Sequence, residues 1–160
     1  MNLIGKKFRI NFLNQLQRKF EITCLGKMIR PESSQHNFTK TQQINLIIFI
    51  GELFRIGQLT NEIVVDCIYN LFFTSNINDR IDEMSLELGL RLLISIESCL
   101  IIDKSNSDMY TKLNIKLLKC YDLLDELMLH NSIHFGNSKK ISNRLKFMIM
   151  DYIDAKSKQK

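Results

Sequence analysis

Proline and glycine are scarce in this chain of 160 residues, which contains one proline and six glycines. Because these residues mark most turns, their scarcity argues against a β-fold of many short strands and favours long helices. Long apolar runs are also missing: the run from Ile44 to Ile50 is interrupted by Asn45 and is far shorter than the ~20 residues of a membrane helix. The sequence therefore predicts a helical protein with no membrane partner, large enough to bury a core in one domain, residues 1–160.

The four cysteines, Cys24, Cys67, Cys99 and Cys120, contain no CxxC pair. The last three lie inside apolar helical patterns, where free cysteine behaves as a small hydrophobic residue. The N-terminal MNLIGKKF places two lysines too early for the apolar region of a signal peptide. We therefore expect buried, reduced thiols in a cytoplasmic protein.

The net charge of +5 is unevenly distributed. Residues 1–40 carry eight Lys or Arg against two Glu, and residues 138–160 carry seven against two acidic residues, whereas residues 41–137 are acidic. Basic ends suit RNA or an acidic protein surface, although they can also serve solubility alone. The candidate RNA contacts are the cations of both ends: Lys6, Lys7, Arg9, Lys139, Lys140 and Lys156.

Apolar residues recur at steps of three and four in six segments, as in amphipathic helices. Residues 84–92 alternate as a strand would, but with their continuation they form a segment well beyond usual strand length. The middle four segments form two helix–turn–helix pairs between two long end helices. This all-α pattern predicts an α-solenoid of stacked antiparallel pairs, with a plain helical bundle as the alternative. The predicted helices are about 6–22, 41–56, 60–73, 82–103, 108–130 and 138–156.

The stretch FIGELFRIGQLT, residues 49–60, is interpreted as the joint of one helix pair. The helix before it is apolar nearly all round, which predicts burial on most sides. Gly57 suits the position that ends this helix, and Thr60 suits the N-cap of the next. Gly51 is expected to allow close helix packing, and Glu52 to cap a neighbouring turn or pair with a base such as Arg55.

Motifs for catalysis are lacking, because the glycines form neither GxGxxG nor a P-loop and no GxSxG occurs. Glu126, His130 and His134 are spaced four apart and could place three metal ligands on one helical face. However, the helix is predicted to end near His130, and a fourth ligand is not evident. We expect no enzyme, no cofactor and no metal; the alternative is a small helical enzyme that uses Glu52, Glu126 and His130.

The last predicted helix carries an apolar stripe with an aromatic residue opposite. At 100° per residue Phe147 lies opposite the stripe, and Arg144, three residues earlier, lies beside it. Asp151 and Asp154 continue this outer face. An exposed aromatic residue with arginine is typical of a binding hot spot, although a neighbouring helix could instead cover Phe147. The stripe consists of Ile141, Leu145, Met148, Ile149, Tyr152 and Ile153.

Four blocks resemble the middle domain of eukaryotic translation initiation factor 4 gamma. The segment FIGELFRIGQLTNEIVVDCIYNLF resembles its central helix pair, and SLELGLRLLISIESCL resembles the next helix. NRLKFMIMDYIDAK resembles its S-R-I-R-F-M-L-Q-D-V-I-D-L-R motif, and FRINFLNQLQRKFE resembles an upstream helix. The blocks occur in the family order over nearly the whole chain, so the resemblance is specific.

The resemblance implies a crescent of HEAT-type helix pairs that binds a DEAD-box RNA helicase of initiation factor 4A type, touches RNA and supports mRNA recruitment in the translation initiation complex. The family's helicase-contacting arginine and phenylalanine match Arg144 and Phe147, while Lys146 replaces a second arginine and loses its bidentate fork. Related middle domains in mRNA decay, splicing or nuclear cap binding are the alternative.

Two departures from the family accompany this resemblance. The helices that begin and close the family domain have no counterpart in the sequence, so the resemblance implies a domain truncated at both ends, either a reduced homologue that needs a partner chain or a fragment. Glu97 stands where the family usually has glycine.

Overall fold

The computed structural model describes residues 3–26, 38–73, 82–100, 107–132 and 141–158. These ranges hold six α-helices and one short 3-10 helix, and they contain no strand. The elements are α1 (Leu3–Cys24), α2 (Lys40–Arg55), α3 (Asn61–Phe73), α4 (Glu83–Ile96), η1 (Glu97–Cys99), α5 (Ser107–Ser132) and α6 (Asn143–Ser157).

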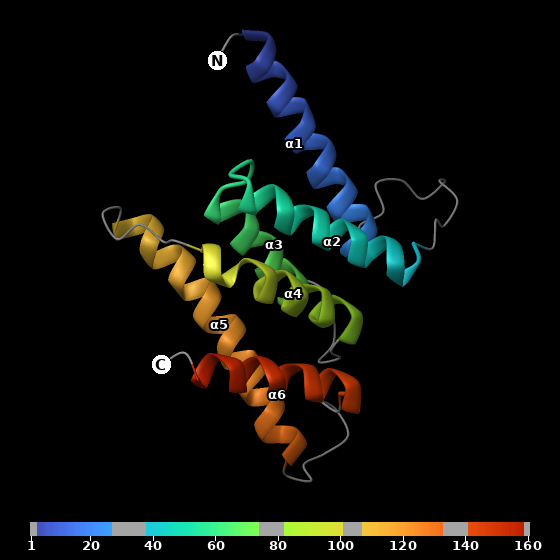
Figure 1. The fold of residues 1–160 in the computed structure, drawn as a ribbon, viewed down its shortest axis with the longest axis vertical. Coiled ribbons are helices and arrows are strands. Elements are labelled where there is room, and N and C mark those ends of the chain that lie inside the picture. The colour runs from blue at the N-terminus through green and yellow to red at the C-terminus, as the bar shows by residue number, and fades with distance from the viewer. Residues whose placement is uncertain (1–2, 27–37, 74–81, 101–106, 133–140, 159–160) are drawn as a thin grey trace.

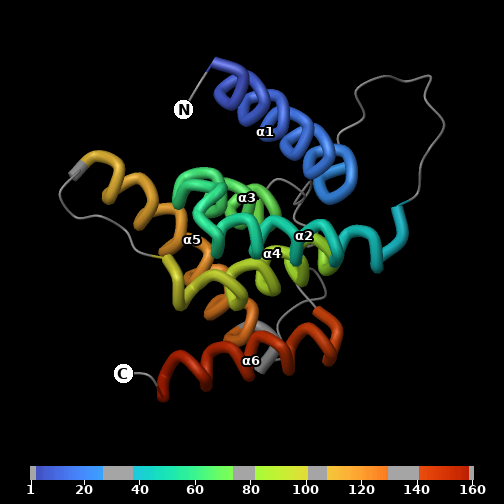
Figure 2. The backbone as a smooth tube through the Cα atoms, turned by 45° about the horizontal axis from the view of Figure 1, so that its top comes forward, coloured from blue at the N-terminus to red at the C-terminus, as the bar shows by residue number. Residues whose placement is uncertain are grey.

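The helices stack in two layers (Figures 1 and 2). One layer contains α2, α4 and α6 in succession, and the other contains α3 and α5. α4 packs against α2, α3 and α6, so it is the central helix of the molecule. α1 packs against α2 at one end of the stack, and its N-terminal half extends beyond the other helices. The predicted α-solenoid of stacked helix pairs is confirmed.

The alternating segment at residues 84–92 is helical, as predicted, and lies within α4. Its pattern is explained by burial on nearly every side, because all residues from Ser85 to Leu93 except Arg91 are buried. Gly89 makes this packing possible: a Cβ atom built there would lie 2.6 Å from the ring of Phe72 on α3. The glycine therefore allows α3 and α4 to approach closely.

The joint between α2 and α3 confirms the predicted turn chemistry. Gly57 has φ of +75° and follows the C-cap Ile56; its N–H donates to the carbonyl of Phe54, and the Gln58 N–H donates to that of Leu53. These two bonds form a Schellman motif, in which glycine adopts the left-handed conformation without strain. At the start of α3, the Thr60 hydroxyl accepts a hydrogen bond from the Ile63 N–H, as expected of an N-cap.

Gly51 also has the predicted packing role. A Cβ atom at this position would lie 2.9 Å from Ser95 Oγ and 3.8 Å from a methyl carbon of Leu92. Both residues belong to α4, so Gly51 permits α2 and α4 to pack closely.

Two predicted helix boundaries are wrong. The helix predicted over 82–103 ends at Ile96 and continues as η1, after which Leu100 is extended; residues 101–103 lie outside the described ranges. The helix predicted from residue 138 begins at Asn143, because the Ser142 side chain caps it by accepting from the Leu145 N–H. Residues 138–140 also lie outside the described ranges.

The predicted burial of the second helix is wrong for one side. Ile48 and Phe49 on α2 are 56% and 46% exposed, although Ile47, Ile50, Leu53 and Phe54 are buried. The sequence of a helix that is apolar on nearly all sides does not show which side lacks a neighbouring helix. Here α3 and α4 cover the inner side, and α1 covers only part of the outer one.

Candidate functional site

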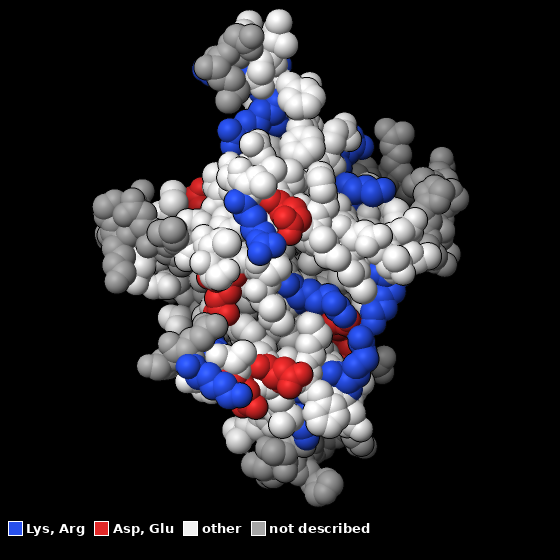
Figure 3. All heavy atoms as spheres, in the orientation of Figure 1, with Lys and Arg blue, Asp and Glu red and all other residues white. Residues whose placement is uncertain are grey.

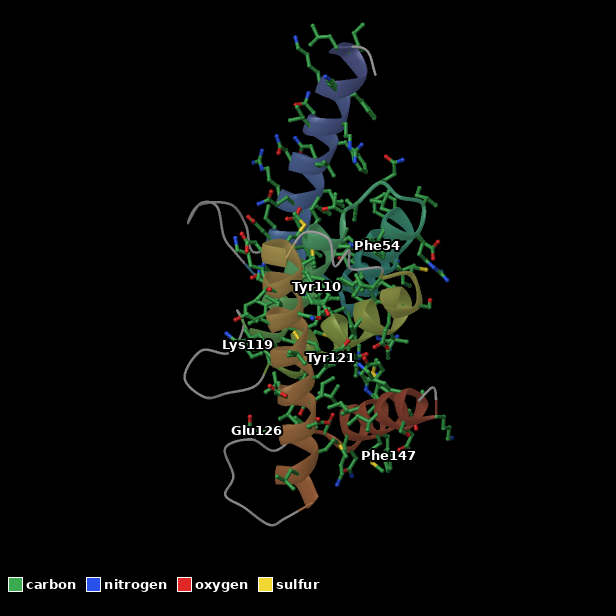
Figure 4. All side chains as sticks on the ribbon, turned by 90° about the vertical axis from the view of Figure 1, so that its left-hand side faces the viewer. Phe54, Tyr110, Lys119, Tyr121, Glu126 and Phe147 are labelled. Atoms are coloured by element: carbon green, nitrogen blue, oxygen red, sulfur yellow. The ribbon has the colours of Figure 1, made fainter. Side chains whose placement is uncertain are left out.

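The outer face of α6 is the candidate binding face. Leu145, Ile149 and Tyr152 are buried against the rest of the protein, whereas Phe147 is 61% exposed. Figure 4 shows Phe147 on α6, at the end of the molecule away from Phe54 of α2. Of the two arrangements that the sequence allowed, the structure has Phe147 exposed.

Arg144 is held beside Phe147 by a buried carboxylate. Glu87 on α4 is only 3% exposed, and its Oε2 atom contacts the guanidinium of Arg144. The same carboxylate accepts hydrogen bonds from Lys40 Nζ at 3.1 Å and from Arg91 Nε at 3.0 Å. One anion thus gathers three cations from α2, α4 and α6, which we call the Glu87 cluster.

The Glu87 cluster presents excess positive charge. Glu87 carries one negative charge against three positive ones, and the three cationic side chains are each 40–59% exposed. Partial desolvation lowers the pKa of Lys40, and the positive charges of Arg144 and Arg91 lower it further. Figure 3 shows blue Lys and Arg atoms around a small red area where these helices meet. The cluster is therefore suited to an acidic partner surface.

A second contact ties the start of α6 to α4. The backbone N–H of Ser142 donates to Glu83 Oε1 at 2.7 Å. Glu83 and Glu87 lie one turn apart on α4, so two acidic residues of one helix fix the beginning of the candidate face.

The remaining residues predicted for this face lie further along α6. Asp151 and Asp154 are exposed, and Met150 between them and Phe147 is partly exposed. Lys146 is half-buried. The face thus runs from the positive Glu87 cluster, past Phe147 and Met150, to two negative charges.

Lys156 is engaged within the molecule. Its Nζ atom lies 3.0 Å from Glu97 Oε1 and 3.3 Å from the ring centroid of Tyr121. The hydroxyl groups of Tyr152 and Tyr121 donate to the same Glu97 oxygen at 2.9 and 3.3 Å. Burial raises the pKa of Tyr152, and the neighbouring Tyr121 and Glu97 raise it further. Glu97 therefore ties η1, α5 and α6 together, and Lys156 is less available to RNA than the sequence suggested.

The other cations predicted to contact RNA are separated in space. Lys6 and Lys7 are exposed on the N-terminal half of α1, at the opposite end of the stack from α6. Arg9 is half-buried, and one of its Nη atoms donates to the carbonyl of Gln58 at 3.4 Å. Lys139 and Lys140 lie outside the described residues.

Of the residues weighed for catalysis, Glu52 and Glu126 lie on different helices, α2 and α5. Glu52 forms the expected pair with Arg55, at 2.9 Å on an exposed surface, while Figure 4 shows Glu126 on α5, pointing away from α6. The side chain of His130 and all of His134 lie outside the described residues. Within the described part of the chain, no group of three His, Cys, Asp or Glu side chains could hold a metal ion. Nor does any described helix have both the length and the apolarity needed to cross a bilayer.

The cysteines are free, and the predicted burial is wrong for Cys99, which is exposed on η1. It was expected inside a long helix, but the chain leaves α4 three residues earlier. Burial raises the pKa of the Cys24, Cys67 and Cys120 thiols to about 12, with a further contribution at Cys67 from Asp66 and Cys24. These three thiols are protonated and unreactive at neutral pH.

The sequence matches the MIF4G domain over residues 1–159. The chain belongs to the MIF4G domain family. Eukaryotic translation initiation factor 4 gamma 1 of Oryctolagus cuniculus is 34% identical over 110 residues, which cover 68% of this chain and 6% of that protein. Eukaryotic translation initiation factor 4 gamma 3 of Homo sapiens is 32% identical over 117 residues, which cover 72% of the chain and 6% of that protein. The chain thus corresponds to a small part of these relatives, and no solved structure matches it significantly.

Sequence reasoning proposed Arg144 and Phe147 for this face but did not include Glu87, Lys40 and Arg91. Glu87 and Arg91 are the charged residues within the otherwise apolar segment SLELGLRLL of this MIF4G domain. Their spacing of four is that of a helical ion pair. A charge inside an apolar helix was therefore the available signal, but its partner on α6 is 57 residues away in sequence.

Proposed function

We propose that this MIF4G domain is a non-enzymatic scaffold in cytoplasmic translation initiation that binds a DEAD-box RNA helicase of initiation factor 4A type. Its family membership and its similarity to initiation factor 4 gamma proteins support the initiation role. The observation that carries the helicase part is the exposure of Phe147 beside the Glu87-held Arg144.

The proposed helicase contact combines an apolar anchor with directed charge. An aromatic ring in a pocket of the partner excludes water from nearby ion pairs, and Arg and aromatic residues carry much of the energy of protein interfaces. Glu87 restricts the Arg144 side chain before the partner arrives, so less conformational entropy is lost on binding. Phe147 would supply the apolar area buried in the contact, and Arg144 would orient the partner through its directed charge.

The charge gradient along α6 suggests what the helicase surface must offer. Acidic groups would face Lys40, Arg91 and Arg144, and basic groups would face Asp151 and Asp154. Complementary charges of this kind set the association rate and the register of a complex more than its final affinity. The same geometry would also serve a DEAD-box protein in mRNA decay, splicing or nuclear cap binding. The similarity to initiation factors favours the role in translation initiation.

A pull-down with purified initiation factor 4A tests the contact. Phe147→Ala combined with Arg144→Glu should abolish helicase capture and leave the circular dichroism spectrum unchanged. The matched control is Lys112→Glu with Ile115→Ala, which makes comparable changes at the same spacing on exposed positions of α5. Equal capture by the wild-type protein and the α6 variant would remove the proposed site.

RNA binding is the second part of the proposal. The exposed Lys6 and Lys7 on α1, together with the sequence-predicted Lys139 and Lys140, would contact phosphates. Such contacts release counterions, so the affinity for a single-stranded RNA should fall as salt rises. Lys6→Glu with Lys7→Glu should weaken binding and reduce this dependence; an affinity that does not change with salt would contradict the RNA part.

A further inference from the structure

A second exposed surface lies at the opposite end of the solenoid from α6. A groove of about 500 Å³ runs between α1 and the outer side of α2. Its apolar lining consists of Phe12, Leu16, Ile22, Leu46 and Phe49. The α1 wall continues past the groove, because Phe8 stacks on Phe12 with ring centroids 6.4 Å apart and is 71% exposed.

The apolar lining has helical spacing on both walls. Ile4, Phe8 and Phe12 follow one another at steps of four along α1, and Leu46 and Phe49 are three apart on α2. Two helices with a trough between them are the geometry in which an amphipathic helix of a partner packs, with its apolar side chains one turn apart.

The charged side chains that line the groove are both positive. α1 carries five Lys or Arg and a single acidic residue, Glu21, which lines a different pocket. Arg18 and Lys19 line the groove itself, and Lys6 and Lys7 are exposed further along the same helix. A partner helix with acidic residues flanking its apolar stripe would complement this surface, whereas pairing α1 with α1 of a second copy would bring like charges together.

We propose that the groove between α1 and α2 binds an acidic amphipathic helix of another protein. The site is distinct from the α6 face and does not depend on the helicase proposal. The partner's apolar stripe would lie on Phe8, Phe12 and Phe49, and its carboxylates would face Arg18, Lys19 and the lysines of the N-terminal half of α1.

Selection from a displayed peptide library tests this inference. The library fixes apolar residues at i, i+3, i+4 and i+7 and randomises the remaining positions among acidic, basic and neutral residues. Selection on the 160-residue chain should enrich acidic peptides. Their affinity, measured by fluorescence anisotropy with the peptide prepared synthetically, should fall with rising salt. Enrichment of basic or neutral peptides, or no enrichment, would overturn the proposal.

Two variants locate the binding site. Phe8→Ser with Phe49→Ser removes apolar area from exposed positions, and Arg18→Glu with Lys19→Glu reverses the charge without touching the apolar lining. Each should weaken binding of the selected peptide about tenfold or more, at an unchanged melting temperature. The Lys112→Glu, Ile115→Ala protein should bind as the wild type does. If the Arg18→Glu, Lys19→Glu variant binds the selected peptide as tightly as the wild type does, charge complementarity is excluded as the basis of binding.

Two other occupants of the groove are measured directly. The wild-type protein alone is sedimented over a range of concentrations. We expect no dimer that depends on the groove, so any self-association should persist in the Phe8→Ser, Phe49→Ser variant. Phosphatidylserine vesicles should not bind the wild type more tightly than the selected peptide does. Groove-dependent dimers would assign the groove to a second copy, and tighter groove-dependent vesicle binding would assign it to a membrane; either result would overturn the proposal.

Discussion

The guanidinium of Arg144 on α6 contacts the carboxylate of Glu87, a residue buried within α4 and 57 positions earlier in the sequence. The contact joins the proposed partner-binding face to the central helix of the fold. Because Lys40 and Arg91 bind the same carboxylate, the two partners of this pair are not equivalent. Arg144 is one of three cations, whereas Glu87 is the common anion.

This asymmetry predicts different costs for the two substitutions. Arg144→Ala should lower the free energy of unfolding by about 1 kcal/mol or less, since Lys40 and Arg91 still satisfy the buried Glu87 and the Arg144 side chain is largely exposed to solvent. Glu87→Gln should cost about 2–3 kcal/mol, because it removes charge-assisted hydrogen bonds and leaves three cations close together. Urea unfolding followed by circular dichroism measures both. A larger cost for Arg144→Ala than for Glu87→Gln would contradict this account of the cluster.

The sequence predicted the parts of this site that depend on local geometry. Helical spacing alone placed Phe147 opposite the buried stripe of α6, and it identified Gly57 and Thr60 at the joint between α2 and α3. The Glu87 cluster could not be predicted in this way, because its cations come from three helices. Their convergence depends on how α2, α4 and α6 stack, which helical periodicity does not specify.

Errors in the predicted boundaries and burial have the same origin. Cys99 and Leu100 continue the apolar pattern of α4, so periodicity extends the helix beyond Ile96. Just after the end of α4, Glu97 accepts hydrogen bonds from Tyr121 on α5 and Tyr152 on α6. These contacts are tertiary, so the periodicity of the sequence cannot predict them. Similarly, the exposure of Phe49 depends on where α1 crosses α2.

The two packed glycines should respond differently to alanine. Gly89→Ala places a methyl group 2.6 Å from the ring of Phe72, which cannot move far in the core, so we expect a loss of about 1–3 kcal/mol in stability. Gly51→Ala meets only the end of a short side chain, Ser95 Oγ at 2.9 Å, which can shift at the cost of weakening its hydrogen bond to the Leu92 carbonyl. The gain of about 1 kcal/mol in helix propensity should then offset much of the strain.

Thermal and urea unfolding of both glycine variants provide the measurement. The midpoint should fall clearly for Gly89→Ala and change little for Gly51→Ala. Equal losses would indicate that the packing of α2 on α4 is as rigid as that of α3 on α4, and would contradict the expected difference.

Thiol alkylation should distinguish Cys99 from the other cysteines. Cys99 is exposed, whereas the thiols of Cys24, Cys67 and Cys120 are held protonated by burial. Iodoacetamide at mildly alkaline pH should therefore add one label to the native protein, at Cys99, and four after unfolding in urea. Peptide mass spectrometry locates the label. Cys99→Ser should remain unlabelled in the native state; labelling of Cys24 as fast as Cys99 would contradict the predicted protection.

Stability should fall at alkaline pH because of the same three thiols, of which those of Cys24 and Cys120 are buried and that of Cys67 is half-buried. In the unfolded chain a thiol ionises near its ordinary pKa of about 8.5, whereas in the folded protein burial raises the pKa of Cys24, Cys67 and Cys120 to about 12. Between these values the unfolded state binds fewer protons than the folded state, so the free energy of unfolding decreases as pH rises. The contribution of each thiol is fully present below about pH 8.5 and is lost progressively up to about pH 12, with a slope of at most about 1.4 kcal/mol per pH unit.

Tyrosine and lysine also titrate in this range, so the thiol contribution is isolated by comparison. Urea midpoints of the wild type and of Cys24→Ala with Cys120→Ala are measured at near-neutral pH and at several alkaline values. The variant should be less stable at neutral pH, because two buried side chains are shortened, but its stability should decline less steeply above about pH 9. Tyrosine and lysine contribute equally to both proteins and cancel in the difference. Parallel pH profiles for the two proteins would show that these thiols are not buried as described.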